Sequence, residues 1–238
     1  MENKVRELKD LMEKARHVVV LTGAGMDTES NIPDFRGKDG LWRNLDPRLL
    51  ASVDTFEENY PLFREFYATR LKLLETRQPH RGHYILAELE EKGLIQAIAT
   101  QNVSRLHHLA GSKHVYELHG NIRTFRCHYC NEPAEPEEFF DNRNCSNCAQ
   151  PGLRPNVTLF GESLPTDAWN NTMTEVLQSD LLIVIGTSLE VSPVNQIPRF
   201  AKGKTVYIND EIAAKGYHFD LVIQGKAKKV LEQLEQLI

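Results

Sequence analysis

Apolar residues along the chain fall into two alternating patterns. Short continuous apolar runs, of which His17–Leu21 is the first, are typical of strands that are buried on both faces of a parallel sheet. Segments with apolar residues at helical spacing separate several of these runs. The predicted strands are 17–21, 95–99, 115–118, 181–185, 205–208 and 221–223, and the predicted helices are 4–15, 61–76, 83–92, 167–178, 193–201 and 226–237.

Strands that alternate with helices predict an α/β fold, a Rossmann-like, doubly wound parallel sheet. Ligands bind such a sheet beyond the carboxyl ends of its strands, near the point where the strand order reverses. Ser192 followed by Pro193 is a helix start signal, with the serine as N-cap and the proline in the first turn.

Two stretches interrupt this alternation. Residues 38–79 combine a polar loop with one predicted helix and no strand, and residues 123–154 hold all four cysteines. We expect the two insertions to form together a smaller domain, a helical module plus a zinc ribbon, beside the sheet. Residues 1–37, 80–122 and 155–238 then make up the larger, discontinuous domain.

Composition narrows the class of protein. The 238 residues are enough to bury a sizeable core, and 41% hydrophobic with 26% charged residues is typical of a globular chain, not a disordered or fibrous one. The net charge of −5 predicts no general attraction to nucleic acid. No apolar run reaches the roughly 18 residues of a membrane span, and residues 1–20 lack a signal-peptide pattern. We therefore expect a cytoplasmic protein without membrane contact.

The cysteines form two Cys-x-x-Cys pairs, Cys127 with Cys130 and Cys145 with Cys148, separated by 14 residues. Each pair typically forms a tight turn that directs two thiolates at one point, and two such turns complete a tetrahedral zinc site. Four thiolates leave no open coordination position, so the single zinc ion would be structural. Two disulfides or four unrelated thiols are the alternative, which a reducing compartment disfavours. His128 is either a rival ligand or a surface histidine.

Thr22-Gly23-Ala24-Gly25 follows the first predicted strand and is similar to a dinucleotide-binding turn. In such a turn, glycines let the backbone approach a pyrophosphate and the next helix N-terminus supplies N–H groups. The motif is incomplete, because Thr28 stands where the usual fingerprint has its third glycine. A plain strand-to-helix turn is the alternative.

The segments that follow resemble, in order, the motifs of the sirtuin family in its bacterial form. Ile32-Pro-Asp-Phe-Arg-Gly37 is similar to the family signature, Thr100–His107 to its TQN and LH motifs, and Glu117–Asn121 to its catalytic-histidine motif. The cysteine pairs stand where the family carries zinc. Further matches, which extend the resemblance over nearly the whole chain, are Arg154-Pro155, Phe160-Gly161-Glu162, Gly186-Thr187-Ser188-Leu189 and Ile208-Asn209.

This resemblance implies an NAD-dependent protein-lysine deacylase. His119 would be the general base, acting through a hydroxyl of the nicotinamide ribose, and the ordinary pKa of histidine suits that role. The acyl oxygen would attack C1′ of that ribose and nicotinamide would leave. The products would be free lysine and O-acyl-ADP-ribose, with NAD as co-substrate and acylated-lysine proteins or peptides as partners.

The resemblance also assigns the NAD-binding residues. Gln101 and Asn102 would offer neutral amides to the nicotinamide ribose, although such a pair alone is equally typical of a turn. Arg36 would bind the phosphates, and Asp210 would share the adenosine ribose with Asn209 or cap a turn. The implied catalytic residues are His119 and Asn102, and the implied NAD-binding residues are Gly23, Ala24, Gly25, Asp27, Asp34, Phe35, Arg36, Gln101, Asn102, Val103, Ser104, Gly186, Thr187, Ser188, Asn209 and Asp210.

By the same resemblance, the substrate peptide would add as a strand between the segments after Glu162 and Leu189. Tyr67 and Arg70 share a helix face and resemble the Tyr-x-x-Arg motif of sirtuins that remove succinyl and malonyl groups. Because a guanidinium and a phenol can bind a distal carboxylate, acidic acyl groups would be accepted beside acetyl. A core Tyr67 with a solvated Arg70 is the alternative. The implied tunnel for the acyl-lysine is lined by Val157, Thr158, Phe160 and Gly161.

Three positions depart from the family pattern. Asp27 replaces a usual serine, Ser104 a usual aspartate and Asn31 a usual glycine. The first two exchange residue types within the implied nicotinamide pocket, so we expect their side chains to face each other and to keep one carboxylate there; drift in a weakened enzyme is the alternative. The altered pocket leaves two other functions open. One is an ADP-ribosyltransferase or NAD hydrolase, and the other is a module that binds NAD or ADP-ribose without turnover, against which the intact His119 and Asn102 argue.

Overall fold

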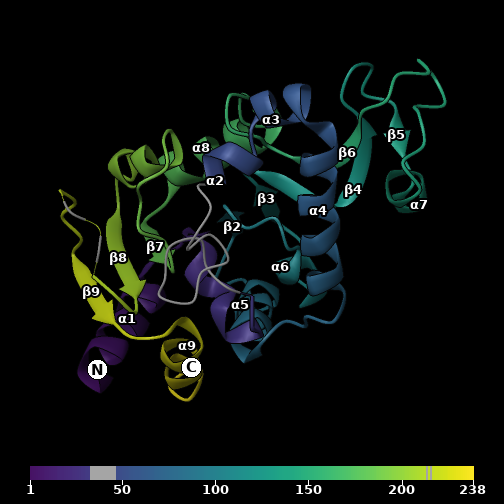
Figure 1. The fold of residues 1–238 in the computed structure, drawn as a ribbon. Coiled ribbons are helices and arrows are strands. Elements are labelled where there is room, and N and C mark those ends of the chain that lie inside the picture. The colour runs from purple at the N-terminus through teal and green to yellow at the C-terminus, as the bar shows by residue number, and fades with distance from the viewer. Residues whose placement is uncertain (33–46, 213, 215) are drawn as a thin grey trace.

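The computed structural model describes residues 1–32, 47–212, 214 and 216–238 (Figure 1). The strands of its main sheet are β1 (Val18–Thr22), β2 (Ala97–Thr100), β3 (Val115–Glu117), β7 (Leu181–Ile185), β8 (Lys204–Asn209) and β9 (Leu221–Gln224). They form one sheet in the order β3-β2-β1-β7-β8-β9, and every neighbouring pair is parallel. The strand order reverses between β1 and β7, which confirms the predicted doubly wound arrangement.

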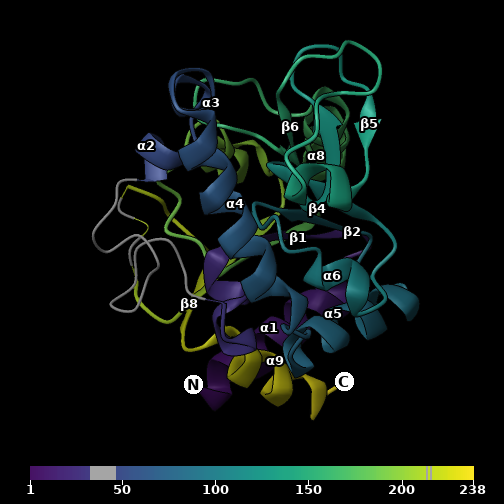
Figure 2. The same cartoon turned by 45° about the vertical axis from the view of Figure 1, so that its right-hand side comes forward.

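Helices cover both faces of this sheet. One face packs against α1 (Glu2–Lys14), α5 (Arg81–Glu91) and α9 (Ala227–Glu235), which lie together at one side of Figure 2. The other face packs against α8 (Thr166–Gln178) and the 3-10 helix η3 (Val194–Phe200). In the part of the chain that the structure describes, no helix has both the length and the apolar character to cross a bilayer.

The two covered faces explain the apolar runs in the sequence. In β1, Val18 and Val20 belong to the core on the side of α1, α5 and α9, whereas Val19 and Leu21 belong to the core on the opposite side. Successive side chains of a strand point to opposite faces, so burial on both sides produces a continuous apolar run, which in β1 ends at the buried Thr22.

A second, antiparallel sheet carries the cysteine pairs and projects away from the chain termini (Figure 1). Its strands are β4 (Gly120–Cys127), β5 (Pro133–Ala134) and β6 (Leu153–Val157), in the order β5-β4-β6. The remaining helices are α2 (Pro47–Leu50), α3 (Val53–Glu58), α4 (Tyr60–Glu75), α6 (Leu106–Leu109) and α7 (Pro136–Phe140). The long helix α4 runs beside β4 and β6 in Figure 1.

Both insertions contribute to one apolar core that is separate from the two cores of the main sheet. Phe56 and Phe63 enter it from α3 and α4, and Phe139 enters it from α7. Phe125 of β4 packs against Phe139, with ring centroids 5.2 Å apart. The helical insertion and the cysteine insertion are therefore packed together, while the exact domain boundaries stay a prediction.

The structure corrects several local expectations. The segment predicted as an α-helix over 193–201 is the 3-10 helix η3, and Pro193, not Ser192, precedes its first residue without any side-chain capping bond. Pro198 lies inside η3 and has no N–H to donate, so it interrupts the hydrogen bonds that a regular α-helix would need there. The polar loop before α4 contains α2 and α3, and an isolated bridge joins Ser52 to Phe160.

Candidate active site and metal centre

A cleft of about 1240 Å³ lies where β1, β2, β7 and β8 end. Its opposite wall consists of α4 and the chain from Val157 to Glu162. Drug-sized pockets measure about 300–1,000 Å³, so this cleft has room for a dinucleotide and part of a peptide. The predicted site residues that line it are Ala24, Gly25, Tyr67, Arg70, Gln101, Asn102, Val103, His119, Val157, Thr158, Phe160, Gly161, Gly186, Thr187, Ser188, Asn209 and Asp210.

Among the described residues, three that were predicted to bind NAD are not part of this lining. Gly23, Asp27 and Ser104 are buried beneath it. The predicted contacts of Asp34, Phe35 and Arg36 lie outside the described residues.

The glycines of the first turn are required by contacts within the protein. Gly25 N–H donates to the main-chain oxygen of Gly186 over 2.7 Å, because β1 and β7 are adjacent strands. A Cβ atom on Gly25 would lie 2.8 Å from Cα of Gly186, and one on Gly23 would lie 2.6 Å from Cβ of Thr187. The two turns that end β1 and β7 thus form one closely packed unit of backbone at the switch point.

The chain after this turn does not form the helix that follows a typical dinucleotide-binding turn. It forms two 3-10 turns, η1 (Ala24–Met26) and η2 (Thr28–Ser30). Asn31 ends η2 with a φ of 56° in the left-handed region, where asparagine is one of the few tolerated side chains. The departure from a usual glycine at this position therefore preserves the backbone conformation.

His119 lies between β3 and β4 and reaches the cleft. Its Nδ1 is 3.0 Å from the main-chain oxygen of Gln101, and since a carbonyl only accepts, Nδ1 carries the hydrogen. Nε2 is then the basic nitrogen of the neutral ring. Burial lowers the pKa of His119 below its ordinary value of 6.5 and outweighs the opposite effect of the Gln101 hydrogen bond. The ring is thus neutral, and able to accept a proton, at neutral pH.

Two neutral amides after β2 are held in fixed orientations. Asn102 is buried and donates from Nδ2 to the main-chain oxygen of Gly23 over 2.9 Å. Gln101 donates from Nε2 to Oγ1 of Thr187 over 3.0 Å. These bonds join the ends of β1, β2 and β7, so each amide is positioned before any ligand arrives.

Asp27 and Ser104 face each other, as the exchange of residue types predicts. Ser104 Oγ donates to Oδ2 of Asp27 over 2.7 Å, and both side chains are buried. The second carboxylate oxygen, Oδ1, lies 3.1 Å from Nε2 of His83, a fully buried residue of α5. Sequence reasoning missed His83, because only the packing of α5 against the first turn brings it to Asp27.

Tyr67 and Arg70 lie together on the face of α4 that lines the cleft. The Arg70 guanidinium carbon is 5.9 Å from the Tyr67 ring centroid, which is within cation–π range. Burial raises the pKa of Tyr67 to about 12, so its phenol remains a neutral donor. Burial also lowers the pKa of Arg70, although a guanidinium stays charged at any physiological pH. The cleft therefore has a cationic and hydrogen-bonding group at this wall.

Further cleft residues carry no motif that the sequence could reveal. Glu29 of η2 accepts the main-chain N–H of Lys228 over 2.7 Å and so ties the first turn to the start of α9. Lys226 and Lys228 line the same end of the cleft. The charges of this end come from segments about 200 positions apart in the chain, which only the fold brings together.

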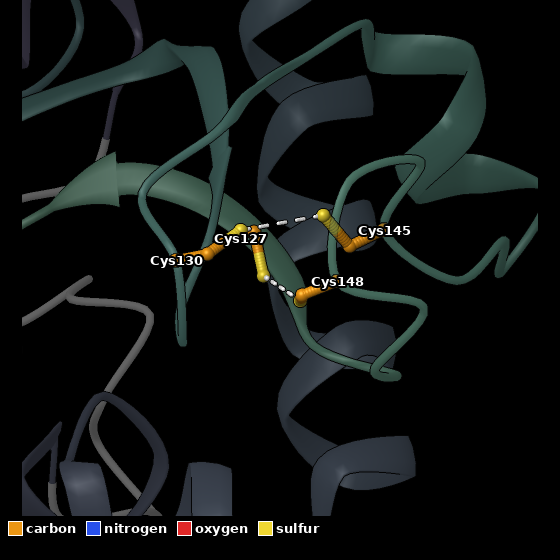
Figure 3. A group of neighbouring side chains, drawn as sticks. All are labelled: Cys127, Cys130, Cys145 and Cys148. Carbon is orange, nitrogen blue, oxygen red and sulfur yellow. Dashed lines mark hydrogen bonds between the residues drawn. The ribbon is translucent and has the colours of Figure 1, made fainter.

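The four cysteines form a compact cluster of free thiols (Figure 3). Their sulfur atoms all lie within 4.8 Å of one another, with Cys127 to Cys148 at 3.6 Å and Cys130 to Cys145 at 3.5 Å. Zinc–sulfur bonds of about 2.3 Å in a tetrahedron place the sulfurs about 3.8 Å apart, close to these distances. A disulfide would need about 2.05 Å. The cluster thus fits one zinc ion and excludes the disulfide alternative.

The two cysteine turns repeat one backbone design. Cys127 N–H donates to Glu132 O over 2.8 Å, and Cys145 N–H donates to Gln150 O over 2.9 Å. The residue after each second cysteine, Asn131 and Ala149, has a positive φ of 62° and 59°. These hydrogen bonds hold the four thiols in place from the backbone, and the His128 ring instead packs against Phe56 at a tilt of 32°, with ring centroids 4.2 Å apart.

Comparisons with known proteins agree with this geometry. Residues 23–193 match the model of the Sir2 family. An "NAD-dependent protein deacetylase" of Oceanobacillus iheyensis is 41% identical over 92% of this chain and 94% of its own length. An "NAD-dependent protein deacylase 2" of Archaeoglobus fulgidus is 38% identical over 98% and 96%. A Sir2 structure with a deacetylated p53 peptide and 3′-O-acetyl ADP-ribose superposes with a TM-score of 0.89, at 33% identity and 98% coverage of both chains.

Proposed function

Because this chain belongs to the Sir2 family, we propose that it is an NAD-dependent protein-lysine deacylase that releases nicotinamide and O-acyl-ADP-ribose. The names of its relatives and the acetyl ADP-ribose in the superposed structure support the reaction. The observation that carries the proposal is His119, which is neutral in the cleft with Nδ1–H fixed on Gln101. Its Nε2 is available to take a proton from a ribose hydroxyl.

In this proposal, bound NAD supplies an electrophilic C1′ and a leaving group, and the chain's residues bind and orient it. The joined turns line the cleft, and Ala24, Thr187 and Ser188 there would offer main-chain N–H groups and hydroxyls to the phosphates. The N–H groups of Gly25 and Gly186 are instead bonded within the protein, to Gly186 O and Ile208 O. Gln101 and Asn102 orient the nicotinamide ribose without adding charge. Asn209, at the end of β8, is placed for the second ribose, and its amide already contacts Tyr207 Oη at 2.8 Å.

The substrate peptide is assigned to the opposite wall of the cleft. Phe160 is 41% exposed there, an unusual position for a phenylalanine, and so offers an apolar surface to the lysine side chain. The peptide backbone would pair with the chain on either side, which tolerates many sequences. Protein substrates are therefore selected mainly by the acylated lysine itself.

Tyr67 and Arg70 support an acidic acyl group as one substrate. The Arg70 charge would bind the distal carboxylate of succinyl- or malonyl-lysine, and the Tyr67 phenol would donate to it. Arg70→Met should lower kcat/KM for a succinyl peptide about 100-fold and leave acetyl peptide within about threefold. Arg64→Met on the same helix, whose guanidinium donates to Phe140 O and not into the cleft, is the matched control. Equal losses with both peptides in the Arg70 variant would contradict an acidic-acyl site.

We also propose that the segments 38–79 and 123–154 act as the small domain that closes one side of the cleft, while the rest of the chain is the NAD-binding domain. Their common core supports this division. A cytoplasmic location is proposed as well. Four free thiols at a zinc site are typical of a reducing compartment, where disulfides are rare.

One assay separates the proposed reaction from its competitor, an ADP-ribosyltransferase or NAD hydrolase. The protein is incubated with NAD and an acetylated or a succinylated peptide, and the products are identified by mass. O-Acyl-ADP-ribose and deacylated peptide are expected in equal amounts. Free or protein-linked ADP-ribose without deacylated peptide would contradict the deacylase, and the absence of nicotinamide release would indicate a binding module.

A further inference from the structure

Arg154 of β6 is the largest side chain that is fully buried among the described residues. Its guanidinium forms two bonds with the Glu162 carboxylate, from Nη1 over 2.6 Å and from Nη2 over 3.0 Å. Nη2 also donates to the main-chain oxygen of Val157. A buried charge is costly unless such partners satisfy it. We therefore expect Arg154 to have a specific structural role at this position.

Glu162 transmits the Arg154 contact to the wall of the cleft. Its second oxygen accepts the main-chain N–H of Leu159 over 2.7 Å, which closes the turn from Leu159 to Glu162. Burial would raise the pKa of Glu162, but the hydrogen bonds from Arg154 and Leu159 hold the pKa below its ordinary value. The carboxylate is therefore ionised and bound on both sides.

The turn that Glu162 closes carries the exposed Phe160, and main-chain hydrogen bonds at Phe160 and Thr158 tie it to the rest of the molecule. Phe160 N–H donates to Ala51 O over 2.8 Å, and Val53 N–H donates to Phe160 O over 3.1 Å. Thr158 N–H donates to the main-chain oxygen of His119 over 2.9 Å, next to the proposed base. A shift of this turn would therefore displace the substrate wall relative to His119.

Arg154 also contacts the first cysteine turn. Its Nη1 lies 3.2 Å from Nδ1 of His128, which stands between Cys127 and Cys130. Its guanidinium carbon lies 5.9 Å from the centroid of the Phe56 ring, which packs against His128. One side chain thus contacts the first cysteine turn through His128, the helical insertion through Phe56, and the cleft wall through Glu162.

We propose that Arg154, through Glu162, is a positioning residue for the acyl-lysine substrate. It fixes residues 157–162 against the cysteine turn of Cys127 and Cys130, and so sets the distance between the tunnel wall and His119. The inference rests on the proposed function. Arg154 touches neither NAD nor the lysine in this account, and its effect is confined to the peptide side of the cleft, since the turns that bind NAD are held by other contacts.

The test compares steady-state constants for both substrates. Glu162→Gln keeps the shape of the side chain but removes its charge, and Arg154→Lys keeps the charge but loses the fork that spans Glu162 and Val157. Each change should raise KM for an acetyl peptide about tenfold and leave KM for NAD within about twofold. Amide hydrogen exchange at Leu159 should accelerate by a similar factor, whereas exchange in β1 and β7 should not change.

Glu175→Gln is the matched control, because the Glu175 carboxylate contacts the His17 ring at 2.7 Å and its side chain is 24% exposed, against 20% for Glu162. It should leave both constants unchanged. Equal changes in both KM values, or an unchanged peptide KM with faster exchange at Leu159, would overturn the positioning role. A wild-type protein that produces no deacylated peptide would instead overturn the proposed function, so the two failures are distinguishable.

Discussion

The two walls of the cleft are held by different means. On the nucleotide side, main-chain groups hold each other, as in the bond from Gly25 to Gly186, and glycines allow the approach. On the substrate side, four thiols and the fully buried Arg154 fix a short antiparallel sheet and the turn that follows it. The first wall belongs to a large parallel sheet with two cores, whereas the second has one small core.

This difference shows why the second wall needs zinc and a buried ion pair. A large sheet covered on both faces buries enough apolar surface to fix its own turns. The small region cannot, and small domains commonly compensate with structural metals. The nucleotide wall should therefore respond to changes of backbone shape, and the substrate wall to loss of metal or charge.

Removing zinc tests the comparison with the largest expected effect. Cys145→Ser, or chelation of wild type, should abolish deacylation, because metal binding contributes about 10 kcal/mol to the folding of small zinc domains. Hydrogen exchange should become fast in β4 and β6 and stay slow in β1 and β7. If both sheets lost protection together, the two walls would be one cooperative unit, and the comparison would fail.

Gly186→Ala should damage the nucleotide wall alone. Gly186 has a φ of +65°, and a Cβ there would lie 2.4 Å from the Met26 nitrogen, so we expect a loss of about 2–4 kcal/mol and a raised KM for NAD. Gly93→Ala is the control: its φ is +73°, but a Cβ would meet nothing within 4 Å, and the loss should stay near 1 kcal/mol. Urea unfolding measures both, and equal losses would contradict the packing argument.

The Asp27–Ser104 pair permits a smaller test of the same wall. Asp27→Ser removes the partner of His83, and Ser104→Asp places two buried carboxylates together. The double variant, Asp27→Ser with Ser104→Asp, should be about 1–2 kcal/mol more stable than the sum of the two single losses predicts, and it should recover part of kcat. A double-mutant cycle measures this coupling, and additive losses would show that the exchange is drift.

The pH dependence should show the smallest effect. His119 acts as a base only when neutral, and burial places its pKa below 6.5, so kcat/KM should remain above half its plateau at pH 6.5 and fall at lower pH. This fall can be measured as kcat/KM from pH 5 to 8 with a substrate peptide that contains no histidine. A midpoint above 6.5 would contradict the buried, neutral base.

The parallel sheet was predictable because strands buried on both faces leave continuous apolar runs. The cysteine spacing likewise identified the metal centre, since two short turns suffice to bring the thiols together. The helix predicted over 193–201 is present as the 3-10 helix η3, but it begins after Pro193 and lacks the predicted cap from Ser192.

The contact between Asp27 and Ser104 was predictable from the exchange of residue types, and the structure confirms it. Other parts of the site could not be predicted, because they depend on contacts between distant segments. His83 was not foreseen, since a histidine on the buried face of α5 carries no sign of its partner. The same holds for Arg154 and Glu162, whose motifs gave no role until the fold placed them against each other.

The most direct test of the account is the product balance of His119→Ala beside wild type. Wild type should convert NAD and acetyl peptide into deacylated peptide and O-acetyl-ADP-ribose in equal amounts. His119→Ala should lose about 10²–10⁴ in kcat with unchanged zinc content, because it removes only the base. Deacylation by His119→Ala within about threefold of wild type would contradict the assignment of the cleft.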